Sequence, residues 1–229
     1  MSRFLRKYLR RGPKVFCIGI NKTGTTSIDI ALQQLGYRTG NVGKGCLLIE
    51  DWARRDFRST IKLCKSGNAF QDIPFSLPDT YRHLDSAYPG SKFVLTIRNS
   101  ADEWYRSLTR FHTLLIGKNR LPTANDLKSF PLLYEGWIWR VQQLTIGVDE
   151  SSPYERDSLV RYYENHNQQV HEYFKNRRDS LLVLKMSAPG KMNRLCQFLG
   201  LENKTGMKMP HIDSETIAKT VHDQLAAVR

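Results

Sequence analysis

The chain has 229 residues, of which 40% are hydrophobic and 10% are aromatic. This composition is enough for one folded core and excludes a disordered protein. No apolar stretch approaches the length of a signal sequence or a membrane span. The four cysteines show neither Cys-x-x-Cys nor zinc spacing, so we expect reduced core thiols, no metal site and a cytoplasmic location.

Nearly half of the formal net charge of +13 lies in the first fourteen residues. Residues 1–14 contain six basic side chains and no acidic one. We predict a basic arm over residues 1–13, followed by a single domain over residues 14–229. The arm is either a solvated tail or a basic amphipathic helix that contacts an anionic membrane surface. No zinc knuckle, RNA-binding aromatic motif or basic helical stripe is present, so we do not expect a nucleic-acid partner.

Residues 14–27 carry the clearest functional signal. Residues 15–20 form an apolar run typical of a buried parallel strand, and residues 21–24 form a polar loop that contains Lys22. Two threonines and a serine then open a segment with helical spacing of its apolar residues. The first backbone N–H groups of a helix lack partners and lie at its positive end, so this junction predicts an anion site.

The chain alternates strands and helices in the α/β manner. After the first strand and helix, apolar runs predict strands at 69–70, 93–97 and 181–184. The helical spacing and turn signals predict the following helices: 47–65, 77–87, 100–115, 132–144, 154–174, 191–199 and 214–228. A capping box, Ser100-Ala-Asp-Glu103, begins the helix after the strand at 93–97.

The loop differs from a nucleotide-binding Walker A loop. Its lysine precedes the second glycine, and the strands at 93–97 and 181–184 end in Arg98 and Lys185 rather than in an acidic residue. Phosphoryl transfer from a triphosphate needs a metal ion to compensate the negative charge of the phosphates. The sequence places no acidic residue at these strand ends that could bind such an ion. A sulfuryl group carries less charge, so a lysine and backbone donors could suffice.

Three segments resemble the sulfotransferases that use 3′-phosphoadenosine-5′-phosphosulfate (PAPS). Residues 21–27 are similar to their 5′-phosphosulfate loop, residues 92–107 to their 3′-phosphate element, and residues 181–201 to a late strand–helix segment. The resemblance implies a three-layer, P-loop-like α/β fold with a central, mostly parallel sheet flanked by helices. It also implies PAPS as the donor, 3′,5′-bisphosphoadenosine (PAP) as the product, and no metal.

The resemblance also implies which residues bind the donor: Asn21, Lys22, Thr23, Gly24, Thr25, Thr26, Ser27, Arg98 and Ser107. Two departures point to the bacterial or carbohydrate-type branch of the family. Cytosolic relatives commonly carry a tryptophan where this chain has Ser27. In many relatives the serine follows the arginine by eight residues, whereas Ser107 follows Arg98 by nine.

The sequence carries fewer signals for the residues that act on the acceptor than for those that bind the donor. Sulfuryl transfer to a hydroxyl benefits from a general base, and we predict Lys22 and Asp72 as the catalytic residues, with Asp72 as the base. Asp72 could instead be a turn or N-cap aspartate, and His112 and His166 are the other candidate bases. We therefore expect metal-independent, in-line transfer from PAPS to a hydroxyl or amine of a carbohydrate or small molecule. The alternatives are a P-loop nucleotide kinase and a non-catalytic protein that binds anions or membrane surfaces.

Overall fold

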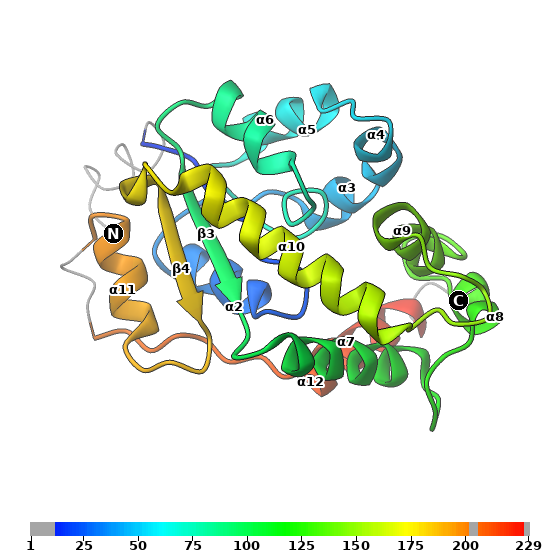
Figure 1. The fold of residues 1–229 in the computed structure, drawn as a ribbon. Coiled ribbons are helices and arrows are strands. Elements are labelled where there is room, and N and C mark those ends of the chain that lie inside the picture. The colour runs from blue at the N-terminus through cyan, green and yellow to red at the C-terminus, as the bar shows by residue number, and fades with distance from the viewer. Residues whose placement is uncertain (1–11, 202–205, 227–229) are drawn as a thin grey trace. The chain divides into compact units, whose positions relative to one another are not determined.

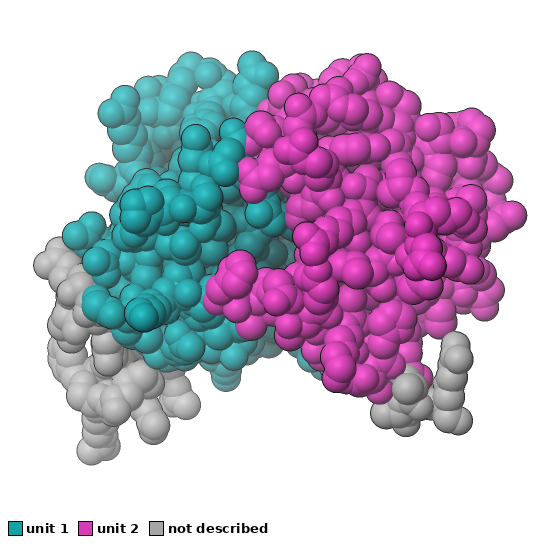
Figure 2. Space-filling view, turned by 90° about the horizontal axis from the view of Figure 1, so that it is seen from below, with its two compact units in different colours: residues 1–99, 166–210 teal, residues 100–165, 211–229 magenta. Residues whose placement is uncertain are grey.

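The computed structural model describes residues 12–201 and 206–226, so most of the predicted basic arm lies outside the described residues. These residues form two compact units, coloured separately in Figure 2. Unit 1 comprises residues 1–99 and 166–210, and unit 2 comprises residues 100–165 and 211–229. The single domain over 14–229 stays a prediction. Within the described part of the chain, no helix is both long and apolar enough to cross a membrane.

Unit 1 is built on a four-stranded parallel sheet in the order β2-β1-β3-β4 (Figure 1). The strands are β1 (Val15–Cys17), β2 (Ala69–Phe70), β3 (Lys92–Ile97) and β4 (Leu181–Lys185). Phe16 pairs with Phe70 on one side and with Phe93 on the other, and Leu95 pairs with Val183. The α/β class with a parallel central sheet is confirmed, and so are the strands predicted from apolar runs.

Alternating residues of β1 face two different helical layers. Val15 and Cys17 pack in the cluster that holds α2 (Thr25–Gln34) and α11 (Lys191–Phe198). Phe16 lies in the opposite cluster, with residues of α6 (Thr80–Ala87) and of the C-terminal half of α10 (Arg156–Phe174). A strand that is buried on both faces needs apolar residues at every position, and this accounts for the unbroken run at 15–18. The predicted three-layer fold is confirmed.

The predicted helix over 47–65 is wrong. Residues 42–66 instead form three short helices, α3 (Val42–Cys46), α4 (Ile49–Ala53) and α5 (Arg58–Leu63), followed by a 3₁₀ turn at Cys64–Ser66. Arg55 has φ 59°, a left-handed conformation that a continuous helix cannot contain.

Unit 2 is helical in its described residues. Its helices are α7 (Ala101–Ile116), α8 (Ala124–Ser129), α9 (Trp137–Ile146), the first part of α10 and α12 (Ser214–Ala226). The Ser100 side chain accepts a hydrogen bond from the Glu103 backbone N–H at 3.1 Å, so the predicted N-cap of α7 is confirmed. Sequence spacing did not predict α8, and α9 begins five residues later than expected. The Trp104 ring of α7 stacks on Tyr163 of α10 with the centroids 4.9 Å apart.

The end of β1 lies unusually close to β3. A Cβ atom at Gly19 would lie 2.1 Å from Thr96 Oγ1 and 2.6 Å from the Thr96 carbonyl oxygen. Thr96 is fully buried and pairs with Leu184 of β4, so its backbone cannot move aside. Only glycine therefore fits at position 19.

We expect Gly19→Ala to lower the free energy of unfolding by about 2–4 kcal/mol, because the methyl group would overlap buried backbone. Gly43→Ala is the matched control, since a Cβ there would meet only Asn41 Oδ1, at 3.5 Å. Chemical denaturation of both variants measures the difference. Equal stability of the two variants would contradict the close approach of β1 to β3.

Candidate functional site

The candidate residues of unit 1 gather where three parallel strands end. Lys22 lies beyond β1, Asp72 lies two residues after β2, and Arg98 directly follows β3. The carboxyl ends of parallel strands share one edge of a sheet, which is where ligands of open α/β sheets bind. The structure therefore brings together residues from three separate segments of the sequence.

The loop after β1 ends in a conformation suited to an anion. Lys22 has φ 72° and Gly24 has φ 100°, so the chain turns sharply before α2. Gly24 is the N-cap of α2, and its carbonyl oxygen accepts the first bond of the helix, from Ile28 N at 3.3 Å. Among the described residues, no side chain caps α2 and no acidic residue lies in its first turn. The positive end of the helix is thus not compensated by a carboxylate of that turn.

The Thr23 side chain holds the loop against β3. Its hydroxyl donates to the Ile20 carbonyl oxygen at 2.6 Å and lies 2.6 Å from Thr96 Oγ1 on β3. Thr23 is completely buried. A contribution of Thr23 to donor binding would therefore have to come from its backbone.

Arg98 is joined directly to the loop. Its Nε donates to the Lys22 carbonyl oxygen at 2.8 Å, across 76 residues of sequence. The bond holds the turn after β1 against the end of β3. Ser107, the other residue predicted to bind the 3′-phosphate, is half-buried on α7 in unit 2, and its part in binding stays a prediction.

A second bond joins the loop to the end of β2. Asn21 Nδ2 donates to Asp72 Oδ1 at 2.8 Å, and the same oxygen accepts the Ile73 backbone N–H at 2.7 Å. Burial raises the pKa of Asp72, while the Ile73 N–H, the Asn21 amide and the charge of Lys22 act in the opposite direction. Asp72 is thus a carboxylate with increased proton affinity, held beside the predicted anion loop.

The two candidate histidines have different surroundings. His166 is 1% exposed, and its Nε2 donates to the Ile18 carbonyl oxygen at 2.8 Å. Burial lowers its pKa to about 4, so the ring is neutral near pH 7. His112 lies in unit 2, where its Nδ1 is 2.8 Å from the Tyr154 hydroxyl.

Two residues of this edge were not predicted from the sequence. Ser76 donates from its hydroxyl to Asn21 Oδ1 at 2.9 Å. Met186 follows β4, and a Cβ atom at Gly24 would lie 2.6 Å from its Cγ atom. The position of Met186 directly after a strand was a usable signal, since the carboxyl end of every strand of a parallel sheet reaches this edge. Ser76 had no comparable signal.

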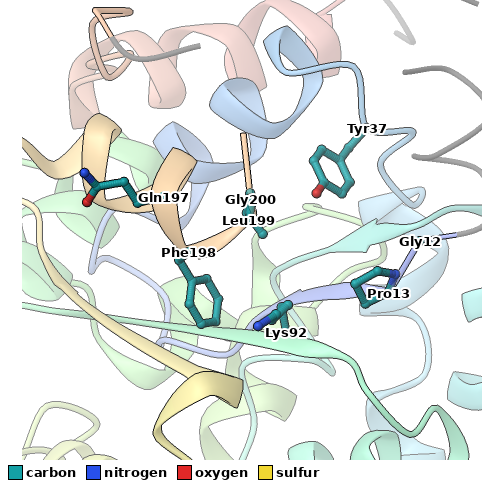
Figure 3. A pocket seen from close by; sticks show the side chains of 8 residues that line it. All are labelled: Gly12, Pro13, Tyr37, Lys92, Gln197, Phe198, Leu199 and Gly200. Atoms are coloured by element: carbon teal, nitrogen blue, oxygen red, sulfur yellow. The ribbon is translucent and has the colours of Figure 1, made fainter. Parts of the chain in front are cut away.

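A pocket of about 250 Å³ lies at the other edge of the sheet (Figure 3). Its lining includes Pro13, just before β1, and Lys92, the first residue of β3. The Lys92 Nζ lies 4.9 Å from the centre of the Phe198 ring and donates to the Asp179 carbonyl oxygen at 2.6 Å. Because these residues mark the amino ends of the strands, the pocket is separate from the candidate site.

Comparison with known proteins identifies the family of the chain. The sequence model of a family described as "Sulfotransferase domain" matches residues 14–217. A search of curated proteins found no match to the chain. The family match includes β1 to β4 and the segments that follow each strand. The chain therefore belongs to the sulfotransferase domain family.

Proposed function

We propose that this sulfotransferase moves a sulfuryl group from PAPS to a hydroxyl or amine of a carbohydrate or small molecule, without a metal ion. Membership of the family supports sulfotransferase activity in general and argues against the alternative of a nucleotide kinase. The observation that carries the finer proposal is the bond from Asn21 to Asp72, 2.8 Å long. It joins a carboxylate capable of acting as a base to the loop suited to the donor's anionic groups.

The residues present fit the donor. The α2 N-terminus, with Gly24 in a left-handed conformation, offers backbone N–H groups to a 5′-phosphosulfate, and Lys22 adds a positive charge. The guanidinium of Arg98 is suited to a terminal phosphate, and we assign it, together with Ser107, to the 3′-phosphate. We assign the other contacts to the 5′-phosphosulfate to loop residues 23–27.

The transfer needs one proton to be removed and one negative charge to be stabilised. Asp72 would accept the proton of the acceptor hydroxyl as its oxygen forms a bond to sulfur. The bond from sulfur to the bridging oxygen breaks on the opposite side, and PAP leaves. Lys22 would neutralise the charge that develops on that oxygen, an interaction that is stronger in the transition state than in the ground state.

Asp72 is a better candidate base than either histidine. Its Oδ1 accepts two hydrogen bonds, whereas Oδ2 accepts none from the described residues and remains available for a proton. The raised pKa also makes it a stronger base than an ordinary aspartate. His166 is almost completely buried and has a pKa of about 4, so it is a weak base. His112 is hydrogen-bonded to Tyr154 within unit 2.

We expect Lys22→Ala to reduce kcat by roughly 10²–10³ while weakening donor binding only moderately, because the lost charge acts on the leaving oxygen. Turnover is measured with the first acceptor that works in a panel of phenols and sugars. Lys62→Ala, at an exposed position of α5, is the control. A Lys22→Ala enzyme with near-normal kcat would remove Lys22 from the chemistry.

Asp72→Asn should lower kcat by roughly 10²–10⁴ and leave PAP affinity nearly unchanged, since the amide keeps the shape but cannot take a proton. In the wild type, kcat/KM should fall as the pH drops through the raised pKa of Asp72, because only the ionised carboxylate is a base. The pH profile and PAP titration measure both effects. A larger loss in His112→Phe than in Asp72→Asn would assign the base to His112 instead.

Arg98→Ala should weaken PAP binding by about 2–4 kcal/mol, because a doubly charged phosphate would lose its bidentate partner. Adenosine 5′-monophosphate, which lacks the 3′-phosphate, should lose much less, although the variant also removes the donor to the Lys22 carbonyl. Calorimetric titrations of both nucleotides in EDTA compare the two losses, with Arg178→Ala as the exposed control. Equal losses would show that Arg98 acts only on the loop, and a requirement for Mg²⁺ would contradict metal-independent binding.

A further inference from the structure

Three side chains form a continuous hydrogen-bonded chain at the candidate site. The Ser76 hydroxyl donates to Asn21 Oδ1 at 2.9 Å, and Asn21 Nδ2 donates to Asp72 Oδ1 at 2.8 Å. The Ser76 backbone N–H also donates to the Asp72 carbonyl oxygen at 2.9 Å, so the segment after β2 folds back on itself. Ser76 is 1% exposed, and its hydroxyl is linked to the Asp72 carboxylate through the Asn21 amide.

We propose that Ser76 is a positioning residue, whose hydroxyl holds the Asn21 amide so that its nitrogen faces Asp72 and keeps this carboxylate oriented toward the acceptor. The inference rests on the proposed function of Asp72 as the base. Ser76 contacts neither substrate in this role. It acts through Asn21, which the sequence had assigned only to the donor loop.

The chemistry of the amide explains why its orientation matters. An asparagine side chain has a donor end and an acceptor end of nearly the same size. A rotated amide would turn its oxygen toward the carboxylate, and two acceptors would then face each other. The Ser76 hydroxyl donates to the amide oxygen, which polarises the amide and strengthens the bond from its nitrogen to Asp72.

The position of Asp72 is defined by its two donors. Both the Asn21 amide and the Ile73 N–H end on Oδ1, which fixes the plane of the carboxylate. Loss of the Asn21 donor would leave one backbone bond, around which the carboxylate could turn. Ser76 thus acts through Asn21 on the orientation of Oδ2 and on the proton affinity of the carboxylate.

Other groups that act electrostatically on Asp72, or on which Asp72 acts, come from several elements. Lys22 of the loop favours the ionised form of Asp72. The negative charge of Asp72 in turn raises the pKa of Asp29 on α2, whose carboxylate disfavours ionisation of Asp72 by the same repulsion. The buried thiols of Cys17 and Cys46 have raised pKa values and are neutral near pH 7. The charges of Lys22 and Asp29 have opposite effects on the ionisation of Asp72, so the hydrogen bonds donated to Asp72 contribute measurably to its proton affinity.

The test measures the titration of the Asp72 carboxyl carbon by NMR in the full chain, without any acceptor. The Asp72 signal is identified as the one missing in Asp72→Asn. Ser76→Ala should move this titration to higher pH by about half a unit, because the ionised form loses part of its stabilisation. Ser76→Thr, which keeps the hydroxyl, should restore the wild-type titration.

Ser91→Ala is the matched control, because Ser91 is also buried and donates to a backbone oxygen, that of Tyr88, at 2.6 Å. It should leave the Asp72 titration unchanged while losing a similar amount of stability. A purely structural Ser76 would behave in the same way as Ser91. An unchanged Asp72 titration in folded Ser76→Ala protein would therefore overturn the proposal.

Kinetics separate this inference from the proposed function. With Asp72 as the base, the acidic limb of kcat/KM in Ser76→Ala should move by the same amount as the NMR titration. Full turnover in Asp72→Asn would refute Asp72 as the base, and with it the catalytic role of Ser76. A catalytic Asp72 whose limb does not move in Ser76→Ala would overturn the inference alone.

Discussion

The close approach of the end of β1 to β3 determines how the candidate site is built. Gly19 allows the Thr96 backbone to pass where any side chain would overlap it. The loop that follows is then near enough for Thr23 to reach Thr96 and for Arg98 to reach the Lys22 carbonyl oxygen. Without this approach, neither strand could brace the turn, and the left-handed conformation of Lys22 would lack its support.

The sequence predicted the parts of the fold that depend on local pattern. The four strands are buried on both faces or bounded by turn residues, so their apolar runs were visible without knowledge of their partners. The single helix predicted over residues 47–65 was wrong because the break at Arg55 depends on a backbone conformation that apolar spacing does not encode. In unit 2, the capping box at Thr123 and Asp126 is the sequence signal for the start of α8.

The sequence predicted individual residues of the candidate site, each from its position after a strand. Lys22, Asp72 and Arg98 each follow a predicted strand, and the parallel order of the sheet brings them to one edge. The contacts between these segments were not predictable, because Asn21 and Asp72 are 51 residues apart and no spacing rule joins them. For the same reason the inward direction of Thr23 and the bond from Ser76 to Asn21 were found only in the structure.

The bond between Asn21 and Asp72 has a thermodynamic consequence. Asn21 lies in the loop that we propose binds the donor, and its amide hydrogen bond favours the ionised form of Asp72. A ligand that displaces Asn21 on binding to the loop changes the proton affinity of Asp72. By the reciprocity of coupled equilibria, the protonation of Asp72 must then change the affinity for that ligand by the same factor. In the proposed mechanism, donor binding and the proton affinity of the base are therefore coupled through the Asn21 amide.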